Sequence, residues 1–277
     1  MTTTRRALVI RYALLSLFAI PWVGVPVWLV IVNSFKPAGE AADLTLSLPS
    51  TWAIIENYST AIVEGDYFHA LLNSAVIAVP TIIAVILLGA GAAWGFGRTN
   101  RRPVQVIYYI VTLSILIPPS LLPTIFLLRE VGLQGSTFGY VLVLIGTRMG
   151  IVVFLATGFI RNMPPDLEEA AALDGASPIQ VFVRIILPLL SPVLFVGAII
   201  LFIGVWSDFF FATFLIPTSG QQTLPLALYS FATSSVSSFR WNLVFAHVVL
   251  SSLPLLIAFV FLQKRVIGGL TEGALKG

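Results

Sequence analysis

The few polar side chains inside the long apolar stretches of this chain are the first candidates for chemistry. Arg148 lies in the middle of one apolar stretch, Asp208 lies in the next, and His247 lies early in a third. Polar groups in lipid are costly, so each is a functional candidate by default. We predict that Arg148 and Asp208 line a path for a polar solute, with a structural Arg–Asp pair between two helices as the alternative. His247 fits a packing role better than a proton relay.

Aromatic residues around Asp208 favour a neutral solute. Trp206 and Phe209 lie on either side of it, and two further phenylalanines follow. Aromatic faces that stack on sugar rings, together with a few polar groups for hydroxyls, suit a carbohydrate. The candidate path residues are therefore Arg148, Trp206, Asp208 and Phe209, although Trp206 also suits an interfacial anchor or a core position. We expect Asp208→Ala to impair transport more than assembly.

The sequence around these residues contains no recognisable set of catalytic side chains. The chain has no cysteine and two histidines, and its sequence contains neither a nucleotide-binding glycine loop nor a cluster of metal ligands. Serines in the apolar stretches have no base at a useful spacing, and such hydroxyls usually bond their own helix backbone. We predict no catalytic residue, no metal site and no cofactor in this chain.

The composition requires lipid as the solvent. Of the 277 residues, 58% are hydrophobic and 10% are charged, whereas soluble domains carry about 25% charged residues. An apolar run of about 20 residues crosses the hydrocarbon core of a bilayer as a helix. The sequence therefore predicts an all-α polytopic membrane protein with six transmembrane helices, near residues 12–32, 69–96, 104–128, 137–160, 190–215 and 241–262.

Prolines and glycines mark expected irregularities in these spans. We expect the first span to bend at Pro21 or Pro26. Prolines at 118, 119 and 123 predict a kink or break in the third span, which is typical of a helix that lines a path. In the second span, Gly91-x-x-x-Gly95 offers a small-residue face for close helix packing.

A polar segment, residues 161–188, separates the fourth and fifth spans. Pro164-Pro165 suits the first turn of a helix, and Gly175 suits a left-handed helix stop. Ser177 and Gln180 then have the spacing of a capping box at a new helix start. The pattern predicts helix, turn and helix, with alanines that leave the backbone bare for a docking partner. An amphipathic connector on the membrane surface is the alternative.

Basic residues give the predicted spans an orientation. Three lie in the loops of one side, Lys36, Arg129 and Arg240. Eleven lie on the other side: Arg5, Arg6, Arg11, Arg98, Arg101, Arg102, Arg161, Arg184, Lys264, Arg265 and Lys276. Because positive loops stay in the cytoplasm, we expect both termini and the 161–188 segment to be cytoplasmic. Basic residues spread in this way indicate membrane topology, not nucleic-acid binding.

The 161–188 segment resembles the EAA signature of bacterial ABC importer permeases. The resemblance is carried by Glu169-Ala170-Ala171, Asp174-Gly175-Ala176, Phe182, Ile185 and Leu187-Pro188. It implies that this cytoplasmic loop holds a coupling helix that docks into a cleft on a cytoplasmic ATPase. The residues that would make this contact are Glu169, Ala170, Ala171, Asp174, Gly175, Ala176 and Pro188.

The resemblance extends beyond this loop. Asn33-Ser34-Phe35-Lys36-Pro37, Asn57-Tyr58 and Asn73-Ser74 are similar to pairs and motifs of sugar-type permeases. The C-terminal tail, residues 263–277, resembles that of the maltose-type second permease, with Leu275 where valine is usual. In that subfamily the tail reaches the ATPase, which implies a second contact through Gly273, Ala274, Lys276 and Gly277.

The family implies an assembly in the bacterial inner membrane. A second homologous permease subunit would complete the pore, two copies of an ABC ATPase would bind ATP and Mg, and an extracytoplasmic solute-binding protein would deliver a sugar or oligosaccharide. Transport would follow alternating access. A charged polyol such as glycerol phosphate stays an alternative because Arg148 suits an anion. An ion-driven secondary transporter is less favoured, because Asp208 is the only carboxylate within the predicted spans.

Overall fold

The structure is a computed structural model that describes residues 5–117, 119–216, 220–233 and 240–274, with residues 5, 6, 9 and 262–274 described by backbone alone. Every regular element in these ranges is a helix, which confirms the predicted all-α fold class. The helices form two compact units, Met1–Leu71 with Leu226–Pro254 and Leu72–Pro225 with Leu255–Gly277. Each unit is described below by itself.

The first unit contains the amino-terminal helices. In chain order these are α1 (Arg5–Ala19), the π-helical turn η1 (Ile20–Gly24), α2 (Val25–Ser34), α3 (Ala38–Ala41), α4 (Ile54–Glu64), the start of α5 (Tyr67–Arg98), most of α14 (Leu224–Thr233) and the first part of α15 (Trp241–Ala274). Pro21 and Pro26 lie in the first two residues of η1 and α2. A proline has no N–H for the regular ladder, which accounts for the change of helix type at the predicted bend.

A buried polar network holds the first unit together at the end of α2. Lys36 is fully buried, and its Nζ donates to the carbonyl oxygen and Oγ1 of Thr45 at 2.9 and 2.8 Å. Asn57 Nδ2 donates to the carbonyl oxygens of Ser34 and Lys36, and Asn57 Oδ1 accepts from Asn242. Buried polar groups require such partners, so the motifs at residues 33–37 and 57–58 have a structural explanation.

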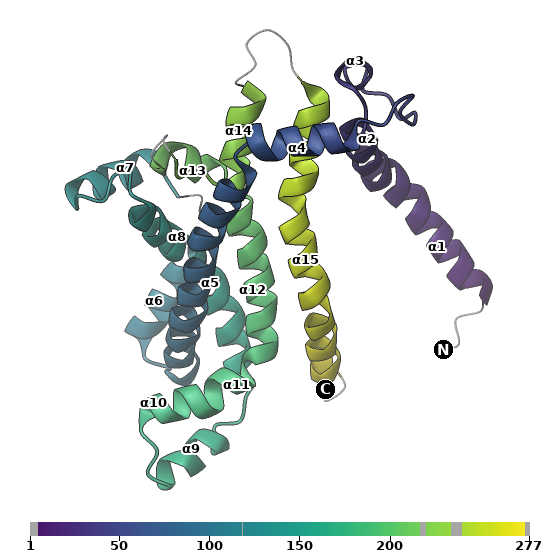
Figure 1. Cartoon of the computed structure of the whole chain (residues 1–277). Helices are drawn as coiled ribbons and strands as arrows, with labels where there is room; N and C mark the ends of the chain where they lie inside the picture. The colour runs from purple at the N-terminus through teal and green to yellow at the C-terminus, as the bar shows by residue number, and fades with distance from the viewer. Residues whose placement is uncertain (1–4, 118, 217–219, 234–239, 275–277) are drawn as a thin grey trace. The chain divides into compact units, whose positions relative to one another are not determined.

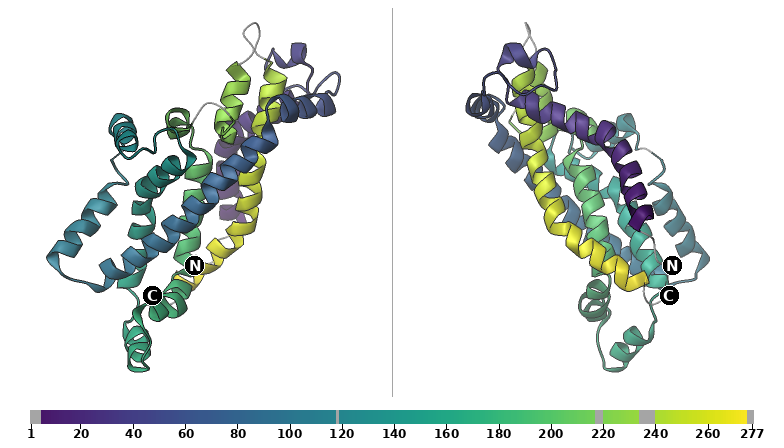
Figure 2. Two further views of the ribbon diagram at one scale, coloured as in Figure 1. Left: turned by 60° about the vertical axis from the view of Figure 1, so that its left-hand side comes forward. Right: turned by 90° about the vertical axis from the view of Figure 1, so that its right-hand side faces the viewer.

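The second unit is arranged around α8 (Thr137–Arg161), which contacts α6, α12 and α13. Its remaining helices are α6 (Arg102–Leu113), α7 (Leu121–Glu130), α9 (Asp166–Leu173), α10 (Pro178–Val181), η2 (Phe182–Ile186), α11 (Leu187–Leu189), α12 (Ser191–Trp206) and α13 (Phe210–Leu215), with most of α5 and the end of α15. Within this unit α9 and α10 lie beyond one end of α5 and α8, and α7 and α13 lie toward the other end (Figures 1 and 2).

Two of the expected spans are interrupted. The 104–128 span consists of α6 and α7, separated by residues 114–120, and the 190–215 span is broken between α12 and α13 at residues 207–209. Among the described residues, four helices are long and apolar enough to cross a bilayer: Ile10–Ser34, Tyr67–Arg98, Thr137–Arg161 and Trp241–Phe261. A fifth is counted only if Pro178–Leu189 and Ser191–Trp206, bent by 75°, form one span. The six-span count therefore stays a prediction.

The segments on either side of the last span also differ from expectation. The expected 216–240 loop contains α14, and α15 continues through residue 262 to Ala274 without a break at the start of the expected tail. Asn73 and Ser74 of α5 fix the chain that enters α14. Asn73 Nδ2 donates to the carbonyl oxygens of Gly220 and Gln222, and Ser74 Oγ accepts from the N–H of Leu224 at 2.8 Å. Ser74 thus satisfies a backbone donor that a helix start leaves free.

Small residues bring α5 and α8 close together, but in a different register from the one expected. A Cβ on Gly89 would lie 2.8 Å from Cγ1 of Val152, and a Cβ on Gly97 would lie 2.5 Å from Cγ2 of Ile160. Gly95 has no atom within 4 Å of such a Cβ. The close-packing face is therefore Gly89, Ala93 and Gly97, two residues out of step with the predicted Gly91-x-x-x-Gly95 pair.

We expect Gly97→Ala to destabilise the packing of α5 on α8. The added methyl group would overlap the branched Ile160 side chain, and overpacking of this kind costs about 1–3 kcal/mol. Gly95→Ala, which places the same methyl group in open space on the same helix, is the matched control. Thermal unfolding of the detergent-solubilised protein would show a lower midpoint for Gly97→Ala only. Equal midpoints for the two variants would contradict this account of the α5–α8 contact.

Candidate functional site

The 161–188 segment folds as the predicted helix, turn and helix. After α9 ends, Gly175 adopts a left-handed φ of +81°. The N–H of Gly175 donates to Ala172 O at 3.1 Å, and the N–H of Ala176 donates to Ala171 O at 3.0 Å. These two bonds form a Schellman motif, which satisfies the last carbonyls of the helix and favours glycine at the left-handed position. The turn is therefore fixed by local sequence.

The second helix begins with the predicted capping box. Ser177 N–H donates to Gln180 Oε1 at 2.8 Å, and Gln180 N–H donates to Ser177 Oγ at 3.4 Å. Two details differ from expectation. Pro164-Pro165 precedes α9 instead of forming its first turn, with Pro165 at the N-cap. The second helix passes through η2 and α11 to Leu189 and then bends by 75° into α12.

The segment presents an outward surface that mixes apolar and acidic side chains. Leu173 is 89% exposed and Ile179 is 75% exposed. Of the residues predicted to meet an ATPase through this segment, Ala171 and Ala176 are half-buried, and Glu169, Ala170, Asp174, Gly175 and Pro188 are exposed. Exposed apolar side chains grouped in this way mark a surface for a protein partner.

An anchor that the sequence did not predict holds α9 to α5. Glu168, next to the predicted Glu169, turns inward. Its Oε2 accepts from Trp94 Nε1 at 2.8 Å, and its Oε1 accepts from Arg98 Nε at 2.9 Å and Nη2 at 2.6 Å. Glu168 is recognisable in the sequence as one of several acidic residues, but its partners lie about 70 positions earlier in the chain. We name Trp94, Arg98 and Glu168 the Glu168 cluster.

Arg148 and Asp208 form the pair that was the structural alternative to a solute path. Arg148 Nη2 lies 3.3 Å from Asp208 Oδ2. Asp208 lies in the break between α12 and α13, where its Oδ1 accepts from the N–H groups of Phe211 and Ala212 at 3.0 and 3.3 Å. Both carboxylate oxygens therefore have structural partners. Asp208 thus joins α8 to the start of α13, whatever else it contributes.

The other path candidates lie beside this pair in sequence. Trp206 is buried and its ring lies 5.1 Å from that of Phe202, whereas Phe209 is more than a third exposed. Arg148 also lies against Gly204, whose added Cβ would be 3.8 Å from the guanidinium. The structure thus brings the four candidates into one region of the second unit, and a role in a solute path stays a prediction.

The remaining candidates are placed in part. Gly273 and Ala274 belong to the backbone of α15, whereas Lys276 and Gly277 lie outside the described residues. His247 is fully buried between the rings of Tyr67 and Phe231, and neither ring nitrogen has a hydrogen-bond partner. A Cβ on Gly65 would lie 2.7 Å from His247 Nδ1. His247 therefore has a packing role, as predicted, but not a hydrogen-bonded one.

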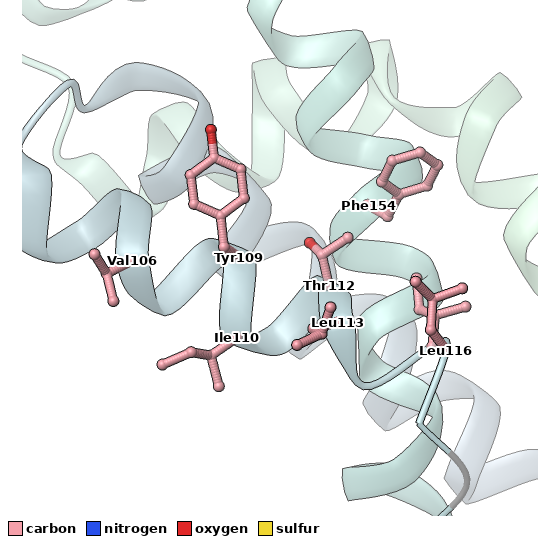
Figure 3. Close-up of a pocket in the computed structure, with 8 residues that line it drawn as sticks. Val106, Tyr109, Ile110, Thr112, Leu113, Leu116 and Phe154 are labelled. Carbon is pink, nitrogen blue, oxygen red and sulfur yellow. The ribbon is translucent and has the colours of Figure 1, made fainter.

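A hollow of about 570 Å³ lies along α6 and is closed on one side by Phe154 of α8 (Figure 3). Val106, Ile110, Leu113 and Leu116 form much of its apolar lining, to which Tyr109 and Thr112 also contribute. Such a lining fits lipid chains or another apolar helix better than a polar solute.

Apolar helices of membrane-spanning length, joined to an exposed helix–turn–helix segment, define a membrane subunit built to meet another protein. Residues 74–270 match the family described as the binding-protein-dependent transport system inner membrane component. The chain belongs to this family. It is the permease subunit of an ABC importer, a multi-pass protein of the inner membrane and a transport component, not an enzyme.

Individual relatives cover nearly the whole chain. The trehalose transport system permease protein SugB of Mycobacterium tuberculosis is 32% identical over 96% of this chain and 97% of its own length. The diacetylchitobiose uptake system permease protein NgcG of Streptomyces coelicolor is 29% identical over 99% and 91%. A solved bacterial ABC transporter involved in import of the acidic polysaccharide alginate aligns with a TM-score of 0.78 at 18% identity, over 95% of this chain and 98% of that one. This likeness shows the shared fold.

Proposed function

We propose that this permease imports a neutral sugar or oligosaccharide by alternating access, driven by a partner ATPase that docks on α9 and α10. The exposed surface of that segment carries the proposal: Leu173 and Ile179 point outward beside Glu169 and Asp174. ATP and Mg would be bound by two copies of the ATPase. Closure of the ATPase dimer would move the segment and rock the attached helices as rigid bodies.

Three observations support the remaining parts of this proposal. Eleven basic residues on one side of the predicted spans against three on the other favour a cytoplasmic position for both termini and for α9–α10. Within the Ile10–Ser34 helix, 6% of the most apolar 18-residue stretch is buried within the chain, as expected if a second permease subunit covers it. A solved alginate transporter is known in complex with an oligosaccharide-bound periplasmic protein, which supports delivery by a solute-binding protein.

The substrate class rests on the relatives and on the charge of the candidate path. Relatives are named for trehalose, diacetylchitobiose and starch degradation products. The charge of Arg148 is offset by Asp208 at 3.3 Å. A neutral carbohydrate therefore fits this region better than glycerol phosphate or another anion, for which an unpaired cation would be expected.

Leu173→Glu tests the docking surface. The side chain is 89% exposed, so the change costs the permease little stability, but it places a charge in a contact that the proposal makes apolar. We expect ATP-hydrolysing activity to co-purify with the tagged wild-type permease from its native membranes. Leu173→Glu should reduce this co-purified activity by at least about tenfold, the usual scale of a hot-spot residue. Ile55→Glu on α4, at a position that is 86% exposed, is the matched control. Equal ATPase recovery from both variants would remove the proposed docking surface.

A further inference from the structure

The Glu168 cluster joins three helices through one carboxylate and one guanidinium. Arg98, the last residue of α5, uses Nε and Nη2 to bond Glu168 of α9. Its Nη1 donates to the carbonyl oxygens of Ile160 at 3.0 Å and Met163 at 2.9 Å, at the end of α8. A cation at this position also offsets the negative end of the α8 dipole. Arg98 thus links α9 directly to both long helices of the second unit.

Trp94 adds a contact to the part of the segment that follows the Gly175 turn. Its Nε1 donates to Glu168 on α9, and its ring stacks on Phe182 of η2 with centroids 5.9 Å apart and planes 24° apart. Trp94 therefore touches the chain on both sides of the Gly175 turn. A shift of α9 or of η2 would have to move Trp94 or break one of these contacts.

The cluster is shielded from solvent, and its connection to α8 is tight. The side chains of Arg98 and Glu168 are 22% and 14% exposed, so water weakens their pairing less than it would at a free surface. The neighbouring Gly97 packs so closely on Ile160 that a Cβ would overlap it. Among the described residues of α9, Glu168 alone makes side-chain hydrogen bonds to α5. Elsewhere in the segment, Arg161 Nη2 donates to Gln105 Oε1 at 2.8 Å, and Ala171 and Ala176 pack against the apolar core.

We propose that Glu168 is the positioning residue that transmits movement of α9 into α5 and α8 during transport. This inference rests on the proposed docking of an ATPase to α9–α10. A charge-assisted contact that is largely shielded from water resists sliding at a helix end, whereas the apolar contacts of α9 allow it. Glu168 therefore acts on the coupling between ATP hydrolysis and solute movement, while Glu169, Leu173 and Gly175 act on docking.

Glu168→Gln tests this division of roles, with Asp166→Asn as the matched control. Asp166 is an exposed acid in the first turn of the same helix, with no side-chain hydrogen bond in the described structure, so the control removes the same charge. Each variant is purified as the full complex, and both recovered ATPase and moles of ATP hydrolysed per mole of trehalose or diacetylchitobiose imported are measured. We expect Glu168→Gln to keep the ATPase and to raise this ratio about tenfold, since a hydrogen bond to a charged group is worth at least that factor.

A second variant keeps the test decisive if Glu168→Gln assembles poorly. Trp94→Phe removes one donor and keeps an aromatic ring against Phe182, so it should raise the same ratio in part. In combination with Glu168→Gln it should add little, because both act through one contact. An unchanged ratio in both variants, or loss of bound ATPase in both, would overturn the positioning role. A wild-type chain that binds no ATPase would instead overturn the proposed function, and this inference with it.

Discussion

Replacing Gly175 with valine is expected to abolish uptake while the membrane helices remain assembled. The backbone at this position has a φ of +81°, and a β-branched residue held there costs about 1–3 kcal/mol. The least costly response is to open the Schellman turn, because the two helices on either side of it are short and exposed. The outward surface of α9 and α10 would then lose its shape. Uptake of labelled trehalose or diacetylchitobiose, normalised to permease in the membrane, measures the effect.

Two further substitutions separate the turn from a general backbone effect. Gly132→Val introduces the same residue at another left-handed glycine, φ +70°, in the connection between α7 and α8, with open space around it. It should retain most of the uptake. Gly175→Asn should be intermediate, because asparagine tolerates the left-handed region better than valine. Normal uptake by Gly175→Val would show that the turn is not needed for coupling.

The parts of the fold that sequence predicted well are those fixed by neighbouring residues. The glycine stop at Gly175 and the capping box of Ser177 and Gln180 depend on contacts no more than five positions apart, and all are present. The apolar composition likewise determined the fold class, because a chain with so few charges can only be solvated by lipid.

The features that could not be predicted from the sequence depend on contacts between segments that are distant in the chain. Glu168 could not be told apart from Glu169 by sequence, because its role comes from Trp94 and Arg98 on another helix. Residues 89–97 contain so many glycines and alanines that several small-residue faces are possible, and packing against Val152 and Ile160 selects one of them. Hydropathy averaged over a span also conceals short breaks, such as the one at Asp208, where a carboxylate caps the next helix.

Asp208→Ala is expected to reduce the amount of assembled permease severely. The change removes Oδ1, which caps α13, and Oδ2, which pairs with Arg148. Breaking a buried pair costs about 3 kcal/mol at the low end of its range, and losing a helix cap costs about 1 kcal/mol more. The structure therefore revises the expectation that transport suffers more than assembly. Permease recovered from membranes as a monodisperse peak measures the loss, and wild-type recovery would contradict it.

A paired substitution can then test the solute path on its own. Asp208→Asn keeps one oxygen for the N–H groups of Phe211 and Ala212, and Arg148→Gln removes the charge that would otherwise be left unpaired. The double variant should be recovered more fully than either single variant, because the two changes compensate each other. Uptake per assembled molecule in the double variant then reports transport without the assembly defect. If that uptake equals the wild-type value, the Arg148–Asp208 pair is structural, and solute recognition depends on other residues or on the partner subunit. A large loss would place the pair in the path, because uptake is measured per assembled molecule.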